Sequence, residues 1–371
     1  MLRYFDAYAT RYRPYKGGAW CYEDGCIYRG LELLFEATDE DRWRDHLLRL
    51  ALAQVDAEGQ MAGYDPTDYN IDNILAGRVL FALDRWTGDP RWMRAARRLG
   101  DQLADHPRTA GGSYWHKRIY PHQVWLDGLY MGLPFQIQLG LHQGDQRLVQ
   151  DALSQLRDAL AMTARPDGLY AHGCDTSGAQ DWADPVTGQS PAAWARAIGW
   201  QAMALVDTAR LIGPASFAAS GLLAPTRALL TRIIGLQRPD GGWLQVIDQP
   251  ELPGNYTESS ASAMFAYALN AMGDLPGAGD AADRAMGFLA SRLHHDGAGA
   301  GFGGICLVAG LGGFSGVYRD GTPAYYLTEP VVADDAKGTG PLMMAAASNT
   351  AAMIALNHSG IGKAEISEQR E

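Results

Sequence analysis

Two aspartates stand at comparable places in the sequence, each at the expected start of an apolar helix. Asp127 lies in YPHQVWLDGLYMGLPF and Asp72 lies in YNIDNI. At such a place a carboxylate can simply cap the helix and interact with its positive end. A carboxyl group among apolar and aromatic neighbours has a raised pKa and can donate a proton near neutrality. Asp127 has such neighbours, whereas Asp72 has polar ones and is expected to stay ionised. Carboxyl groups with different pKa values are typical of glycoside cleavage.

Cationic side chains and histidines stand close to these aspartates or in other expected loops. The stretch GGSYWHKRIYPHQ contains His116 and Lys117, AWARAIGW contains Arg196 one turn before Trp200, and LYAHGCD contains His172. Cations of this kind can bind a substrate carboxylate, or they can pair with surface acids. The alternative for His172 is a turn histidine that bonds the backbone. No Cys/His set has zinc spacing, so we expect neither a metal nor a cofactor.

Two further segments have no assigned chemistry. The glycine-rich stretch 297–316 does not open a helix after a strand, and no Lys-Ser/Thr pair follows it, so it does not predict a phosphate-binding loop. A close-packed lid or floor beneath a cleft is expected instead. The motif WCYEDG places Glu23 and Asp24 near the expected site, without indicating a role for either.

Helical periodicity dominates the chain and recurs as a loose repeat of paired helices. One set is apolar and begins near aromatic or acidic residues; its members are expected at 23–38, 70–87, 125–140, 194–212, 258–272 and 341–357. The other set is amphipathic and more charged; its members are expected at 39–56, 88–106, 144–163, 224–237 and 279–295, with 2–13 as a sixth. Six inner helices wrapped by six outer ones predict an all-α (α/α)6 barrel, with 1–371 as one catalytic domain.

Long connections lead into the inner helices, and tryptophan is concentrated in them. They cover 106–123, 165–193, 237–257 and 295–340. Loops of this length in a compact domain are usually functional, and these should gather at one end of the barrel. Aromatic rings at a concave rim suit the apolar faces of sugars, while core packing at the barrel mouth is the simpler explanation for any single ring.

Bulk composition limits the possible partners. The 371 residues carry a net charge of −11, which argues against nucleic acid as a partner. We expect no membrane association and a cytoplasmic location, because neither a signal peptide nor a spanning segment is evident. The four cysteines are expected to be unpaired in a reducing compartment. The oligomeric state is left open between monomer and dimer.

Several motifs together resemble one enzyme family. HKRIYPHQVWLDGLYMGLPF, WARAIGW, YTESSASAMF and YYLTEPVVADDAKGTGP are similar to those of the unsaturated rhamnogalacturonyl hydrolases, glycoside hydrolase family 105, whose kin are the unsaturated glucuronyl hydrolases of family 88. The resemblance implies an (α/α)6 barrel that removes a 4,5-unsaturated galacturonate from pectin-derived rhamnogalacturonan oligosaccharides. Such enzymes act after lyases and add water across the sugar's C4–C5 double bond.

The resemblance also implies roles for individual residues. Asp127 would protonate C4 and, once deprotonated, activate the attacking water, and Asp72 would be the second carboxylate. The positions that match the sugar site are Trp20, Tyr22, His116, Lys117, Trp125, His172, Trp194, Arg196 and Trp200.

Three alternatives remain open from the sequence. The same hydration could act on unsaturated glucuronyl oligosaccharides from ulvan, glucuronan or arabinogalactan. An (α/α)6 sugar epimerase would generally need paired histidines, which the expected inner-helix starts lack. A non-catalytic sugar-binding protein would lose only affinity when Asp127 is changed to asparagine.

Overall fold

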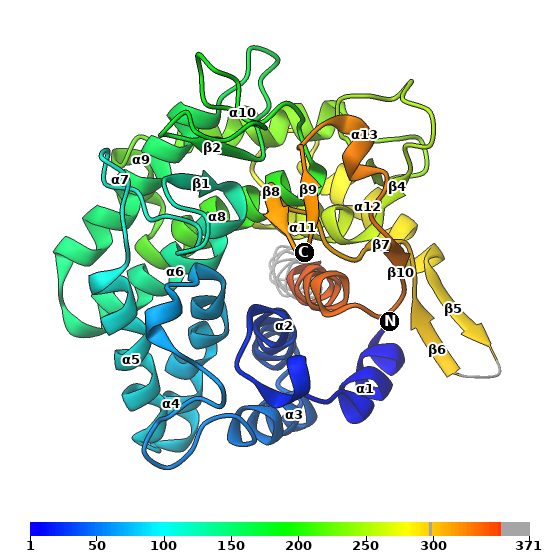
Figure 1. The fold of residues 1–371 in the computed structure, drawn as a ribbon. Helices are drawn as coiled ribbons and strands as arrows, with labels where there is room; N and C mark the ends of the chain where they lie inside the picture. The colour runs from blue at the N-terminus through cyan, green and yellow to red at the C-terminus, as the bar shows by residue number, and fades with distance from the viewer. Residues whose placement is uncertain (297–298, 350–371) are drawn as a thin grey trace, which may run out of the picture.

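Helices arranged in two concentric layers form the body of the molecule (Figure 1). The structure is a computed structural model, and it describes residues 1–296 and 299–349. The inner layer consists of α2 (Tyr22–Thr38), η3 (Ile71–Val79) continued by α4 (Leu80–Thr87), α6 (Leu126–Gln143), α8 (Ala195–Ile212), α11 (Ser259–Ala271) and a helix over 336–349. The outer layer consists of α1 (Leu2–Arg11), α3 (Asp41–Leu52), α5 (Arg91–Asp105), α7 (Gln146–Thr163), α10 (Leu223–Gly235) and α12 (Ala278–Ser291).

The side-chain burial of each helix agrees with its sequence pattern, amphipathic in the outer layer and apolar in the inner layer. The outer helix α5 buries one stripe, including Trp92 and Leu99, and exposes its arginine-rich face. The inner helix α11 buries every residue from Ser259 to Leu269. An amphipathic helix covers a core with one face, whereas a helix apolar on all sides must be surrounded. The predicted (α/α)6 barrel is therefore confirmed.

The structure differs from the expected boundaries in two inner helices. The second begins with the three-ten turns of η3 before it continues as α4. Gly77 lies in these turns, where an added Cβ would come within 2.2 Å of Leu99 and 3.0 Å of Phe135. The last inner helix begins at 336 rather than 341. The expected stretches 297–298 and 350–357 lie outside the described residues.

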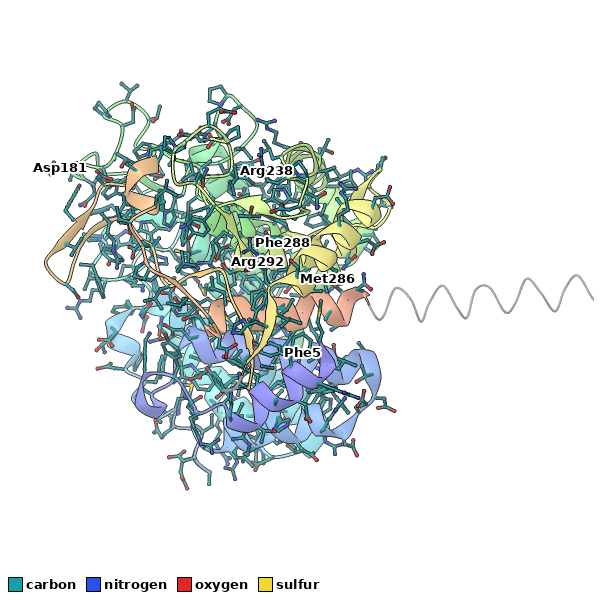
Figure 2. All side chains as sticks on the ribbon, turned by 90° about the vertical axis from the view of Figure 1, so that its right-hand side faces the viewer. Phe5, Asp181, Arg238, Met286, Phe288 and Arg292 are labelled. Carbon is teal, nitrogen blue, oxygen red and sulfur yellow. The ribbon has the colours of Figure 1, made fainter. Side chains whose placement is uncertain are left out.

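Short antiparallel strand pairs occupy the long connections. They are β1 (Gln123–Trp125) with β2 (Gly173–Asp175), β3 (Trp243–Leu244) with β4 (Thr257–Glu258), β5 (Leu293–Asp296) with β6 (Gly299–Phe302), β7 (Ile305–Cys306) with β10 (Val331–Val332), and β8 (Gly312–Phe314) with β9 (Val317–Arg319). Figure 2 shows the hairpin β8–β9 and the loop that carries Asp181 at the same end of the ring. The remaining short helices are α9 (Pro214–Ala219) and α13 (Pro323–Tyr326), with three-ten turns η1 (Lys16–Gly18) and η2 (Pro66–Asp68).

A buried polar network ties the inner helices together. Asp207 of α8 accepts from Arg78 of η3 at 2.5 Å and from the hydroxyl of Tyr267 of α11 at 2.5 Å. Arg210 donates to the same Tyr267 hydroxyl at 2.7 Å. Burial alone would raise the pKa of Asp207, but the neighbouring arginines outweigh it and hold that pKa below its usual range. The aspartate is therefore ionised and paired inside the ring.

Two other observations concern the chain as a whole. All four cysteines, Cys21, Cys26, Cys174 and Cys306, are buried and free, as predicted. Among the described residues, no helix is long and apolar enough to cross a membrane.

Candidate active site

Asp127 lies in the first turn of α6 and does not cap it. The N-cap position belongs to Trp125, and no side chain caps this end. The carboxyl group turns instead to His172, whose Nε2 lies 3.0 Å from Oδ2 of Asp127. Both atoms are buried, and neither makes a hydrogen bond in the described parts of the chain, so the contact between them is one of distance and charge. The helix-cap explanation of this residue is therefore wrong, and the carboxyl is held by a buried histidine.

The pairing of β1 with β2 explains how a residue 45 positions later reaches Asp127. Trp125 stands opposite Gly173, and the backbone N–H of Leu126 donates to the carbonyl of His172 at 2.9 Å. A Cβ on Gly173 would lie 2.8 Å from the Trp125 ring, so only glycine allows this approach. The strand pair thus places His172 directly beside the start of α6.

His172 is fully buried in an aromatic wall. Its ring centroid lies 4.8 Å from that of Trp194 and 5.4 Å from that of Trp125. Its Nδ1 lies 2.7 Å from the hydroxyl of Tyr326 in α13. Tyr326 stacks on Trp194 with 5.5 Å between ring centroids. The two predicted site tryptophans, Trp125 and Trp194, therefore both contact the histidine that holds Asp127.

Asp72 carries the second candidate carboxylate, which forms an ion pair with Lys117. Lys117 Nζ lies 2.5 Å from its Oδ2, and His116 Nε2 lies 3.6 Å from its Oδ1. Burial raises the pKa of Asp72, but Lys117 and His116 outweigh it, so the pKa is lowered below its usual range. The same pair raises the pKa of Lys117 against the effect of burial. The expectation that Asp72 stays ionised is supported by this geometry.

His116 connects the two halves of the site. Its ring stacks on Trp125 with 4.3 Å between centroids, and Trp125 stacks on Tyr120 at 4.7 Å. Burial lowers the pKa of His116 to about 4, with Asp72 opposing that shift. The imidazole is consequently neutral at pH 7. Because Trp125 contacts both His116 and His172, the fold brings two histidines to one ring, although neither stands at a helix start.

Arg196 is buried in the first turn of α8. Its guanidinium lies 4.7 Å from the Trp194 ring centroid and donates to the carbonyl of Cys306 and to Ser260 Oγ. Ser260 in turn donates to Glu258, the fully buried N-cap of α11, at 2.8 Å. Burial lowers the pKa of Arg196, but Cys306 and Glu258 outweigh it and the pKa is raised. Arg196 is thus a fixed positive charge behind the aromatic wall.

The Tyr22 phenol is close enough to both Arg196 and Asp72 for their charges to change its pKa. Burial and then the charges of Glu23 and Asp72 raise the pKa of its phenol, while Arg196 lowers it. Lys16 Nζ lies 5.5 Å from the Tyr22 ring centroid, and Lys337 Nζ lies 6.0 Å from it. The phenol therefore stands among charges from several inner helices, as expected of a central site.

The remaining predicted positions lie nearby or deeper in the barrel. Trp20 donates through Nε1 to the carbonyl of Asn73 at 2.8 Å, so it packs against the segment that carries Asp72. Trp200 stacks on Tyr130 with 5.3 Å between centroids, and that is its ring contact in the described part of the chain. Trp200 is thus buried in the ring, one turn after Arg196 on α8, and its contact with a sugar stays a prediction.

The structure gives Asp24 and Glu23 distinct surroundings. Asp24 accepts from the Tyr12 hydroxyl at 2.7 Å and from Gln54 Nε2 at 2.9 Å, so it ties down the N-terminal segment. Glu23 lies 3.1 Å from Lys16 Nζ through its carboxylate. Asp24 therefore has a structural role, which the residues next to it in the sequence did not indicate.

The glycine-rich stretch is close-packed in one part and exposed at the tip of the hairpin β8–β9. A Cβ on Gly310 would lie 2.7 Å from Arg319 Nη1 and 3.5 Å from the Trp125 ring. Leu311 packs in the cluster formed by Tyr120, Trp125 and Trp182. The part around Gly310 and Leu311 therefore packs against the wall that holds Asp127, whereas residues 313–316 are exposed, and a lid or floor over a cleft stays a prediction.

Two buried charged residues of this region, Glu258 and Lys337, were not predicted from the sequence. Glu258 belongs to the motif YTESSASAMF. An acidic residue directly before a helix of small side chains is the pattern that could have indicated this N-cap. Lys337 lies 2.8 Å from Asp335, and both are buried. Among the described residues, no group of three or more His, Cys, Asp or Glu side chains could hold a metal ion.

Comparisons with known proteins agree with this architecture. The family model described as Glycosyl Hydrolase Family 88 matches residues 5–352. A 24.9 kDa protein in the picA locus of Rhizobium radiobacter is 55% identical over 229 residues, which are 59% of this chain and 98% of that protein. The unsaturated rhamnogalacturonyl hydrolase YesR of Bacillus subtilis is 27% identical over 267 residues, covering 69% of this chain and 72% of the relative. The solved structure of a family 105 glycoside hydrolase from C. acetobutylicum ATCC 824 superposes with a TM-score of 0.84 at 34% identity, covering 89% of this chain and 93% of that one.

Proposed function

The chain belongs to the glycoside hydrolases of families 88 and 105, and from this premise we propose that it is an unsaturated rhamnogalacturonyl hydrolase. It would release the 4,5-unsaturated galacturonate from the non-reducing end of rhamnogalacturonan oligosaccharides. The observation that carries the proposal is the carboxyl of Asp127, held through one oxygen by His172 at the aromatic end of the ring. The likeness to the Bacillus subtilis hydrolase supports the choice of substrate.

In the proposed reaction Asp127 is the catalytic acid. Its O–H bond breaks as a C4–H bond forms, and the electrons of the C4–C5 double bond are used for the new bond. Positive charge develops at C5 and the ring oxygen, and water adds to C5 while its proton passes to the Asp127 carboxylate. The resulting hemiketal opens at C5, and the hemiacetal at C1 then releases the aglycone. The carboxyl is thereby returned to its protonated form.

The charges around Asp72 support a positioning role for this residue. Its carboxylate is ionised, but Lys117 neutralises it at 2.5 Å. A neutralised carboxylate stabilises a distant positive charge weakly, yet it remains a good hydrogen-bond acceptor. We therefore assign Asp72 to the sugar hydroxyls rather than to the charge at C5. Tyr22, His116, Lys117, Trp125 and Trp194 would line the same sugar.

Disappearance of the ultraviolet absorbance of the conjugated uronate tests the proposal. A panel should contain lyase products ending in unsaturated galacturonyl-rhamnose and products ending in unsaturated glucuronyl units from ulvan, glucuronan and arabinogalactan. We expect the fastest loss with the rhamnose product and none with the Asp127→Asn variant. Preference for a glucuronyl product would move the assignment to that substrate, and no loss with any product would reject the hydration.

A further inference from the structure

Three side chains from distant segments form a line of close polar contacts that ends at the candidate acid, with a hydrogen bond between Tyr326 and His172 and a charge-pair contact between His172 and Asp127. The hydroxyl of Tyr326 lies 2.7 Å from Nδ1 of His172, and Nε2 of His172 lies 3.0 Å from Oδ2 of Asp127. Tyr326 and His172 are both fully buried. Water therefore cannot supply alternative partners, and the direction of the hydrogen bonds is decided within the line.

The tyrosine fixes that direction. Burial raises the pKa of Tyr326 far above its ordinary range, so the hydroxyl keeps its hydrogen. Among the residues that the structure describes, Nδ1 of His172 is the acceptor within reach of that hydroxyl. Donation from Tyr326 to Nδ1 places the imidazole hydrogen on Nε2, the nitrogen that lies 3.0 Å from Oδ2 of Asp127. The opposite direction would leave a buried hydroxyl hydrogen unpaired, which is unfavourable.

Packing holds the two rings in this arrangement. Gln245 donates through Nε2 to the backbone carbonyl of Tyr326 at 3.1 Å, and its Oε1 accepts from Trp194 Nε1 at 3.2 Å. Trp194 stacks on Tyr326 and also contacts the His172 ring. Neither the phenol of Tyr326 nor the imidazole of His172 can therefore rotate without displacing the Trp194 ring.

We propose that Tyr326 is a positioning residue, which selects the Nε2–H tautomer of His172 and thereby directs the reactive proton of Asp127 to Oδ1. The proposal rests on the function proposed above for Asp127. Because Oδ2 is buried and faces the hydrogen-bearing Nε2 of His172 at 3.0 Å, a hydrogen on Oδ2 would have no acceptor there, and a protonated Asp127 carries its hydrogen on the other oxygen. The Asp127 side chain is 15% exposed although Oδ2 is buried, so Oδ1 is the carboxyl oxygen left to meet a substrate. The proton is thus presented toward the substrate rather than toward the wall.

The tautomer can be measured without any substrate. Nitrogen-15 spectra of protein labelled at its nine histidines distinguish Nδ1–H from Nε2–H rings, and the His172→Gln variant identifies the signal. We expect an Nε2–H ring in the wild type and loss of that preference in Tyr326→Phe. An Nδ1–H ring in the wild type would overturn the proposal, whichever glycoside the enzyme uses.

Kinetics provides the second measurement, with a neighbouring tyrosine as the matched control. Tyr325 donates its hydroxyl to Glu329 at 2.6 Å and makes no hydrogen bond with His172 among the described residues, so Tyr325→Phe removes the same group elsewhere. We expect Tyr326→Phe to lower kcat about tenfold with KM little changed, and Tyr325→Phe to leave kcat near the wild-type value. An unchanged tautomer together with an unchanged kcat in Tyr326→Phe would refute the positioning role. Absence of turnover by the wild type would reject the proposed function, while the spectra would still judge the tautomer.

Discussion

The ammonium group of Lys117 lies 2.5 Å from a carboxylate oxygen of Asp72, and the Asp72 side chain is 8% exposed. The Lys117 side chain is 23% exposed, so the carboxylate is the more buried partner, and without the lysine its charge would be disfavoured there. The contact keeps the Asp72 carboxylate ionised, in the same ring as the carboxyl that is proposed to deliver a proton.

Removal of Lys117 should make activity sensitive to mild acid. In the wild type, burial raises the pKa of Asp72, but Lys117 and His116 lower it by more than burial raises it. The net pKa is below its usual range, so the carboxylate stays ionised in mild acid. In Lys117→Met the raising effect of burial is no longer offset by the lysine, and Asp72 should protonate at a higher pH. The acid limb of kcat/KM should consequently move upward in pH. An acid limb at the wild-type position would contradict the role of this pair.

Replacement of Asp127 by asparagine should abolish turnover and keep binding. The amide preserves the shape of the side chain but has no proton to give to C4, so kcat should fall by about three orders of magnitude or more. Calorimetry with an unsaturated disaccharide would show affinity within a few-fold of the wild type. Turnover near the wild-type rate would show that another group delivers the proton.

Stability should fall as the pH is lowered toward 4. Burial lowers the pKa of His116 to about 4 and the pKa of His106 to about 4. An unfolded histidine titrates near pH 6.5, so between about 6.5 and about 4 the unfolded chain binds more protons, and the free energy of unfolding decreases with falling pH. Each histidine contributes up to about 1.4 kcal/mol per pH unit. Urea unfolding at several pH values should show this slope, and His106→Gln should make it shallower. An unchanged slope in that variant would argue against a neutral buried His106.

Asp207 should matter far more to stability than a surface acid does. Its pair with Arg78 has side chains that are both 2% exposed, so Asp207→Ala leaves a buried guanidinium uncompensated. We expect a loss of about 3–5 kcal/mol in the free energy of unfolding. The control is Asp274→Ala, which breaks an exposed pair with Arg227 and should change stability by about 1 kcal/mol or less. Equal melting temperatures for the two variants would contradict the importance of the inner network.

Gly173 should tolerate no side chain, whereas Gly287 should tolerate one. A Cβ at Gly173 would meet Trp125 at 2.8 Å and Leu311 at 2.9 Å, so alanine would push β1 and β2 apart and displace His172. A Cβ at Gly287, inside α12, would meet nothing within 4 Å. We expect Gly173→Ala to lose activity and stability, and Gly287→Ala to be as stable as the wild type or slightly more so, because alanine favours helices. Retention of full activity by Gly173→Ala would show that the strand pair does not position the site.

Local pattern predicted the helices and their arrangement well. The apolar stretch after Trp125 and the charged stretch after Gly144 differ in a way that distinguishes a surrounded helix from a covering one, and α6 and α7 follow those patterns. Helix starts were less certain, because the three-ten turns at Ile71 depend on how closely Gly77 meets Leu99 and Phe135. Close approach between segments distant in sequence has no local signal.

The sequence by itself determined the fold, the family resemblance and the two candidate carboxyl groups, since periodicity and short motifs are properties of neighbouring residues. Only the tertiary structure decided what each carboxyl contacts. Asp127 was equally consistent with a helix cap until β2 brought His172 to it, and Tyr326 became relevant only because α13 reaches the same wall. The physical reason is that a side chain's protonation and hydrogen bonds depend on groups within a few ångströms in space, and in a ring of helices those groups come from opposite ends of the chain.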